Sequence, residues 1–419
     1  MRRLIKTLKY LVLTIVFLAA LLSIANAYLV WRTGTRLEER LNKLRTAGAP
    51  VSLAEIGAAP AVPGKNAADV LENIKPELQA LIKEINPVLS KATADNSRPD
   101  PFPEDDRKTL EQAFANHPKV LPALQEAAEC TVYHSRLNYQ VATHAYLGEL
   151  LPWVQLLREA INALDTQERL QLQRKDRDGA MRSCLTALQL TRVCDGEPMI
   201  ISHLVILATR SVGVRMANEV LRAGSVSPEL HRELETELAK HDSIDGLRRS
   251  LVTERVFGLQ SMDEQMGGSW ITRAYVNDNK CQYLDLMDEW IEKAGVPYAQ
   301  FKEQEIGIQQ GTITFRYVLL KLLAPAVMKI QEAEFRTRCM VRCLRVLNAL
   351  MAKKLSEPPA KLTELGLPAD TTTDPYTGQP LVVKKVDGQW LIYGLGPNLK
   401  DDGGKLDNYD DVGLGPVKK

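Results

Sequence analysis

The chain has 419 residues, 45% of them hydrophobic and 25% charged, a composition typical of globular proteins with two or three domains. Lysine and arginine together number 53 and aspartate and glutamate 52, so the formal net charge is +1. A nearly neutral chain has no overall field that attracts a polyanion. We therefore expect no nucleic-acid partner.

The N-terminus combines a basic start with a long apolar run. Residues 1–9 include four basic side chains, and residues 10–31 include no charged one. The run is long enough to cross a bilayer as one helix, and Tyr10 and Trp31 stand at its ends, where aromatic rings favour the headgroups. We predict a single-pass protein of the inner (cytoplasmic) membrane, with residues 1–9 in the cytoplasm and the bulk of the chain on the exported side. The lipid bilayer is then the partner of this helix.

A cleaved secretory signal is the alternative for the same segment. Ala25-Asn26-Ala27 has the small-x-small pattern of a cleavage site, with Ala27 as the last residue removed. The apolar run continues to Trp31, which is longer than an ordinary signal core, and this favours an uncleaved anchor. Both interpretations export the remainder of the chain.

Residues 32–106 are predicted to form a stalk and a linker. Apolar positions from Leu37 to Leu44 have helical spacing, so the membrane helix can continue outward until Gly48. Prolines and glycines then recur, and between them one helical pattern covers residues 67–85.

Residues 107–354 are predicted to form an α-helical domain of stacked helix pairs. Broad apolar stripes with helical spacing cover residues 146–164 and 180–193. Residues 199–221 are apolar nearly all round, which is typical of a central buried helix. Pro325 is expected to kink or end one helix before a long amphipathic helix completes the domain.

No common enzyme signature occurs in the sequence. A Gly-rich phosphate loop, a His-Glu-x-x-His helix and a Gly-x-Ser-x-Gly elbow are all absent, so we assign no catalytic residue. His203 lies in an apolar run and is more simply a hydrogen-bonded core residue than a catalytic one. Glu197 is expected to start the helix that follows it. Most of the six cysteines are expected to be buried free thiols, with Cys184 and Cys194 the best candidates for a disulfide.

Residues 355–419 are predicted to be a small module built on a β-hairpin. A short helical turn is expected over residues 360–365. Two strands follow, at residues 381–386 and 389–393, and Asp387-Gly388 between them is typical of a tight hairpin turn. This module follows the last long helix of the domain.

An acidic loop follows the predicted hairpin. Like charges this close repel one another unless water or a cation offsets them. A hard cation, Ca²⁺ before Mg²⁺, is the natural bridge, and a flexible solvated tail is the alternative. The carboxylates are Asp401, Asp402, Asp407, Asp410 and Asp411, with Asn398 and Asn408 among them.

These residues resemble the C-terminal region of the major pseudopilin of type II secretion systems. That family has Asp-Pro, Gly, a strand pair, Tyr-Ser-Leu-Gly-Ala-Asp-Gly and a closing Asp-Ile. Here the corresponding residues are Asp374-Pro375, Gly378, residues 381–386, Tyr393-Gly394-Leu395-Gly396-Pro397-Asn398 and Asp411-Val412. The resemblance implies a calcium site formed by the Leu395 carbonyl, Asn398 and Asp411, with Asp401, Asp402 or Asp407 completing the shell.

The chain departs from a pseudopilin in two ways. It lacks the processing site of Gly, an aromatic residue or Met, and Glu, and a long helical region separates its apolar run from the module. We expect a mainly α protein: an N-terminal transmembrane helix, an exported multi-helix domain and a small C-terminal β-hairpin module with an acidic loop. The expected function is a non-enzymatic scaffold or docking role among envelope proteins, linked to type II secretion. An exported hydrolase with its site dispersed over the helical domain is the alternative.

Overall fold

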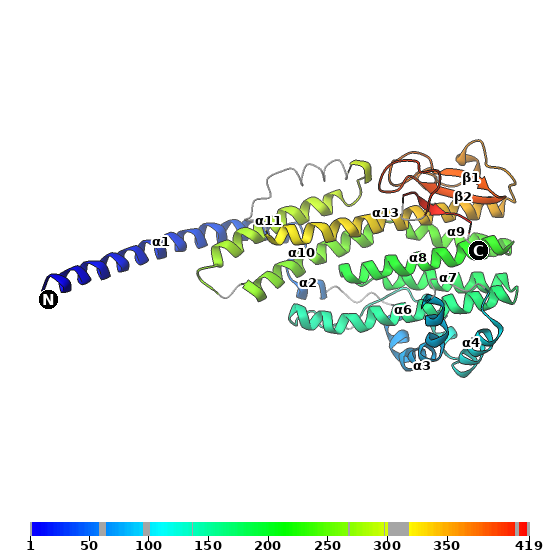
Figure 1. Cartoon of the computed structure of the whole chain (residues 1–419), viewed down its shortest axis with the longest axis horizontal. Helices are drawn as coiled ribbons and strands as arrows, with labels where there is room; N and C mark the ends of the chain where they lie inside the picture. The colour runs from blue at the N-terminus through cyan, green and yellow to red at the C-terminus, as the bar shows by residue number, and fades with distance from the viewer. Residues whose placement is uncertain are drawn as a thin grey trace.

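Helices form most of the protein, and a three-stranded antiparallel sheet lies near the C-terminus (Figure 1). This confirms the expected mainly α class with a small β module. The computed structural model describes residues 2–57, 64–94, 101–135, 137–266, 269–296, 298–300, 318–406 and 410–416. Its shorter elements include α2 (Leu53–Gly57), α4 (Glu104–Asn116), α5 (Val120–Ala128), α9 (Pro228–Leu238), η1 (Ala239–His241) and η3 (Leu362–Leu365).

Helix α1 (Arg2–Thr46) runs without a break through the predicted membrane span and the predicted stalk. It projects from the rest of the molecule as a rod with the N-terminus at its far end (Figure 1). The apolar side chains along the rod are exposed, for example Phe17 at 63% and Leu22 at 71%. By length and composition α1 can cross a membrane; α8 (Ile200–Ala223) passes the same test but lies mostly inside the protein.

The C-terminal part of α1 is packed onto the domain and is not a free stalk. It lies beside α11 (Arg273–Lys293), which in turn packs on α10 (Asp245–Met266). Leu37 is buried in the apolar cluster that these helices form, and the Arg40 guanidinium is paired with the Asp285 carboxylate. The rod is therefore joined to the domain through both apolar and ionic contacts.

Helix α3 (Ala67–Ala94) belongs to the domain, although residues 32–106 were expected to be stalk and linker. It extends beyond the predicted residues 67–85 and continues through Pro76 and Pro87. A proline inside a helix costs about 3 kcal/mol, but each fully buried leucine or isoleucine contributes about 1.5–3 kcal/mol, so several of them outweigh it. The buried side chains of α3 include Leu71, Leu78, Leu81 and Ile85.

The centre of the domain is a stack of three consecutive helices, α6 (Thr143–Gln173), α7 (Arg177–Cys194) and α8. The two apolar stripes and the buried helix predicted for this region are confirmed. A side-chain cap defines the start of α7, because the Asp176 carboxylate accepts a hydrogen bond from the Gly179 amide at 2.9 Å. All six cysteines lie in the described part of the chain, and all are buried free thiols.

Helix α13 (Val318–Ala352) packs along α8 and carries the C-terminal module. It continues through Pro325, so of the two expected effects of this proline, a kink or an end of the helix, the end is wrong. The reason lies in its later turns, where Val341, Leu344 and Leu347 are at most 1% exposed. Burial along this length outweighs the loss of one backbone hydrogen bond. Residues 301–317, before the helix, lie outside the described part.

The predicted hairpin is present, with strands β1 (Val382–Val386) and β2 (Gln389–Gly394) in antiparallel register. Asp387 and Gly388 have φ of 51° and 74°, which matches the tight turn that this pair favours. A third strand, β3 (Val412–Leu414), pairs with the other edge of β2 and was not predicted. At three residues, it is too short to show a strand pattern before its partner is known.

The β module shares one core with the helices. Ile392 and Val412 are buried in the same apolar cluster as Phe335 and Cys339 of α13. The Cys339 thiol donates to the Val412 carbonyl at 3.2 Å. Because its inner face is covered by α13, the sheet is fixed to the domain and does not form an independent cap.

Candidate functional site

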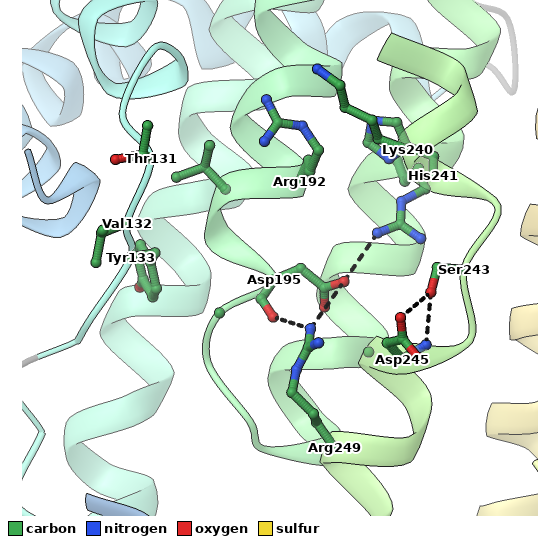
Figure 2. Close-up of a pocket in the computed structure, with 14 residues that line it drawn as sticks. Thr131, Val132, Tyr133, Arg192, Asp195, Lys240, His241, Ser243, Asp245 and Arg249 are labelled. Atoms are coloured by element: carbon green, nitrogen blue, oxygen red, sulfur yellow. Dashed lines mark hydrogen bonds and ion pairs between the residues drawn. The ribbon is translucent and has the colours of Figure 1, made fainter. Parts of the chain in front are cut away.

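A pocket of about 440 Å³ opens where the end of α7, the middle of α8, η1 and the start of α10 meet (Figure 2). Its size is ordinary for a small-molecule site. It also meets the extended residues Thr131, Val132 and Tyr133 (Figure 2). The ionisable lining residues are Arg192, Asp195, Arg210, Lys240, His241, Asp245 and Arg249, in addition to Tyr133.

The approach of α10 to the end of α7 requires a glycine. A Cβ atom at position 246 would lie 2.7 Å from the Asp195 Oδ2 and 2.9 Å from the His203 Cε1. Only Gly246 lets the backbone come this close to the carboxylate without displacing it. The first turn of α10 is therefore seated directly against the ionic centre of the pocket.

Asp195 is that centre, and cations from two further helices surround it (Figure 2). Its carboxylate bonds to His203 Nδ1 at 3.2 Å and accepts from Arg210 Nη2 at 3.3 Å. The Arg249 guanidinium donates to the Asp195 backbone carbonyl at 3.1 Å. Burial alone would raise the pKa of Asp195, but the His203 hydrogen bond and the Arg210 charge outweigh it and lower the pKa.

His203 lies beneath the pocket and joins α8 to α13. Its Nε2 bonds to the Glu334 carboxylate at 2.9 Å, opposite the Asp195 contact. Burial would lower the pKa of His203, but these two carboxylates raise it to about 9, so the imidazole is charged at neutral pH. The prediction of a buried, hydrogen-bonded core histidine is confirmed. Its role as an ionic cross-link could not be read from the apolar run around it.

A second ionic group lies on the η1 side of the pocket. The Glu237 carboxylate accepts from Arg192 Nε at 2.6 Å and from Lys240 Nζ at 3.3 Å, and it bonds to His241 Nε2 at 3.2 Å. Burial would raise the pKa of Glu237, but hydrogen bonds from His241 and Arg192 lower it to about 2. Burial and the charge of Arg210 lower the pKa of His241 to about 4, so this imidazole is neutral at pH 7.

Two buried nitrogens of the lining have no hydrogen-bond partner within the described residues. They are Nε of Arg210, a residue that is 4% exposed, and Nδ1 of His241, which is 1% exposed. Buried polar atoms are nearly always paired, and an unpaired one costs about 1–3 kcal/mol. Both belong to residues that line the pocket. The Arg210 Nε–H is a donor, whereas the Nδ1 of the neutral His241 is an acceptor, because its Nε2–H already donates to Glu237. The arrangement can therefore hold a small ligand that accepts a hydrogen bond from Arg210.

The structure brings together three of the six predicted metal ligands. The Asp411 side chain is 1% exposed, and its Oδ2 accepts from the amides of Asp402 and Gly404 at 3.1 and 2.7 Å. Asn398 Nδ2 donates to the Asp402 carboxylate at 2.6 Å. Asp411 Oδ1 is buried with no partner among the described residues, and burial raises the pKa of Asp411.

The other predicted ligands point elsewhere or are not described. The Asp401 carboxylate accepts from the Tyr393 hydroxyl at 2.9 Å, and Lys384 Nζ donates to the same hydroxyl at 3.1 Å. For Leu395 the structure shows a contact of its amide, which donates to the buried Asp374 carboxylate at 3.1 Å, and this does not place its carbonyl at the predicted site. Asp407 lies outside the described residues. Within the described residues, no three His, Cys, Asp or Glu side chains are arranged to hold a metal ion.

Glu197 is a buried carboxylate whose role the sequence misplaced. Helix α8 begins at Ile200 with Met199 as its cap, so Glu197 does not start the helix. Its carboxylate instead accepts from the hydroxyls of Tyr139 at 3.0 Å and Tyr146 at 2.8 Å, and from Ser135. Burial raises the pKa of Glu197. The two tyrosines lie more than 50 positions away in sequence, and no local pattern links them to it.

Comparison with known proteins finds no match: no family model, no curated protein and no solved structure is similar to this chain. The resemblance of the C-terminal residues to a pseudopilin therefore stays a prediction, and the function is argued from the geometry alone.

Proposed function

We propose that this chain is a membrane-anchored envelope protein with a non-enzymatic docking role, and that its basic pocket receives an anionic group of its partner. Four permanently cationic side chains line the pocket against two aspartates. The unpartnered Arg210 Nε is the observation that carries the proposal, because a buried guanidinium N–H is satisfied by an acceptor. Arginine forks suit carboxylate and phosphate oxygens.

The hydrolase alternative has less support from the pocket. Such an enzyme needs a nucleophile, or a bound water, within hydrogen-bond reach of a base. The Ser243 hydroxyl donates to the Asp245 carboxylate at 2.7 Å, and His241 Nε2 faces Glu237. His203, the most basic imidazole here, is held between two carboxylates. A docking role uses the same cations without requiring a nucleophile.

Topology and location follow from α1 in this proposal. The exposed apolar rod would span the inner membrane once, and the basic residues 1–9 would stay in the cytoplasm. The domain and its pocket would then face the exported side, where other envelope proteins are available as partners. The α1–α11 contacts support a docking role, because they hold the domain at a defined orientation to the anchor.

Sulfate binding tests the pocket, because sulfate stays doubly charged across the neutral range. We expect the full-length chain in detergent to bind sulfate, and the Arg249→Gln and Arg192→Gln variants to bind it about tenfold or more weakly. A lost charge-assisted hydrogen bond of about 1.5–3 kcal/mol is the reason. Calorimetric titration at constant ionic strength measures both affinities.

Arg232→Gln is the matched control. Arg232 lies on the neighbouring helix α9, is 67% exposed and pairs with Glu229 one turn away. Its loss changes the net charge equally but should leave sulfate affinity unchanged. Equal weakening in all three variants would indicate a general charge effect and contradict the pocket.

We also propose that the C-terminal module takes up calcium, as its resemblance to a pseudopilin implies. The buried, unpartnered Asp411 Oδ1 supports this, and so do Asp401 and Asp402, whose charges add to the effect of burial in raising the pKa of Asp411. A cation bound there would pair with the orphan oxygen and offset the repulsion. The link to type II secretion rests on that resemblance alone.

Calcium should raise the unfolding temperature of the full-length chain relative to chelator. At a calcium concentration 100 times the Kd, the gain is about 2.7 kcal/mol. Asp411→Asn should abolish the gain, because it removes the buried anionic ligand. Scanning calorimetry in calcium, in magnesium and in chelator measures this. Identical unfolding profiles in all three would contradict calcium binding by the module.

A further inference from the structure

An exposed apolar patch lies at the start of α11. Outside α1, six large apolar side chains are exposed among those that the structure describes: Leu151, Leu204, Trp270, Ile271, Tyr275 and Val386. Three of the six fall within residues 270–275, where Trp270 is 51% and Ile271 74% exposed. Such clustering marks an interaction surface, whereas single exposed apolar residues are ordinary.

This patch lies beside the apolar part of α1. Asn26 Nδ2 donates to the Trp270 carbonyl at 3.1 Å, and Asn277 Nδ2 donates to the Thr33 hydroxyl at 3.5 Å. Both contacts join residues 244 positions apart, so α1 and α11 run side by side in the same direction. The start of α11 is thus the end nearest to the projecting rod (Figure 1).

The contact fixes the depth of the patch relative to the apolar run. Asn26 lies inside residues 10–31, five positions before Trp31. At about 1.5 Å per residue, the patch lies roughly 7–8 Å within the apolar run. Interfacial apolar segments typically insert about 5–10 Å into the boundary between headgroups and acyl chains.

We infer that residues 269–275 form a second membrane contact, which inserts Trp270 and Ile271 into the outer face of the bilayer beside α1. The inference rests on the proposed membrane anchor. Residues 265–272 carry no charge, and Arg273 follows them, as suits an apolar tip with a basic flank. Tyr275 then lies at the headgroup level, where tyrosine is favoured.

This second contact adds affinity and orientation. The fold leaves Trp270 and Ile271 exposed. Moving these side chains from water into the membrane interface buries their apolar surface, which strengthens membrane binding. Two contacts also restrict the tilt of α1 and the attached domain relative to the plane of the membrane. The face of the domain that carries the basic pocket then keeps a fixed position relative to the membrane.

Tryptophan quenching in vesicles of phosphatidylcholine brominated on its acyl chains tests the inference. The full-length Trp31→Phe variant removes the tryptophan that ends the apolar run and should keep a quenchable fraction of its emission. Adding Trp270→Phe should abolish that fraction. Adding Trp153→Phe instead is the matched control, because Trp153 lies on α6 inside the domain, and quenching should persist.

The possible outcomes distinguish failure of the membrane anchor from failure of the second contact. Chains that do not float with the vesicles would reject the anchor itself. Chains that float, but lose no quenching with Trp270→Phe, would reject the second contact alone. Trp270 emission that is shielded from both bromolipid and aqueous iodide would assign the patch to a second copy or another protein, and would also overturn the inference.

Discussion

Replacing Asp195 with alanine is expected to lower the free energy of unfolding by about 3–5 kcal/mol, because it leaves a buried charge unpaired. The Asp195 carboxylate faces both Arg210 and the charged His203, which are 4% and 2% exposed. Both cations are thus nearly fully buried, and Asp195 is the carboxylate that they share. Denaturant titration of the full-length chain in detergent measures the loss.

Asp245→Ala is the matched control, since Asp245 lines the same pocket but its side chain is exposed. It should change the unfolding free energy by no more than about 0.5 kcal/mol. In the Asp195→Ala background, Arg210→Met should cost less than it does in the native chain, because its partner is already gone. Equal costs in both backgrounds would contradict the pairing.

The unfolding free energy should also fall as pH rises from about 6.5 to 9, by about 3 kcal/mol from His203 alone. The folded protein holds this proton with a pKa of about 9, above the ordinary value of 6.5. The contribution is therefore complete below pH 6.5 and is lost as pH rises through 9. Unfolding titrations at pH 6.5, 8 and 9 measure it.

The His203→Gln variant separates this effect from other alkaline changes. It should be less stable at pH 6.5 and nearly independent of pH up to 9. His241 acts in a different window, because its folded pKa of about 4 lies below the ordinary 6.5. Its contribution is lost as pH falls from 6.5 toward 4. An alkaline slope that survives in His203→Gln would refute the assignment.

Several elements could be read from short stretches of sequence because local chemistry decides them. The hairpin follows from Asp387-Gly388, which needs positive φ and is flanked by apolar strand residues. Helix α1 follows from its uninterrupted apolar run, and its end follows from Gly48, which has φ of 71°. These features depend on residues within a few positions of one another.

Predicted helix boundaries were wrong where the burial of apolar side chains outweighed the helix-breaking effect of a proline. The predicted helix ended at residue 85, just before Pro87, and Pro325 was expected to kink or end a helix, yet α3 and α13 continue through these prolines. A proline removes one hydrogen bond, whereas the apolar face of a long helix can bury many side chains. How much a face buries depends on partner helices, and those cannot be identified from the segment itself.

The candidate site was hidden for the same reason. Asp195, Arg210, Glu237 and Arg249 show no motif, and each has the ordinary appearance of a charged helical residue. They meet where the end of α7, the middle of α8, the end of α9 and the start of α10 come together, and Gly246 lets α10 approach. The acidic loop, by contrast, was recognisable in the sequence. The structure brings its residues Asn398, Asp402 and Asp411 together, but the Asp401 carboxylate bonds to Tyr393 instead.

The sequence by itself determined the apolar N-terminal helix, the helical character of the middle and the hairpin near the end, because periodicity and turn chemistry are local properties. Tertiary structure alone decided that the β module shares the helical core, that α11 places Trp270 beside α1, and that His203 joins two carboxylates. Those features depend on pairs of residues far apart in the chain. The burial of whole helix and sheet faces decides which distant residues meet, and this cannot be predicted from any single stretch of sequence.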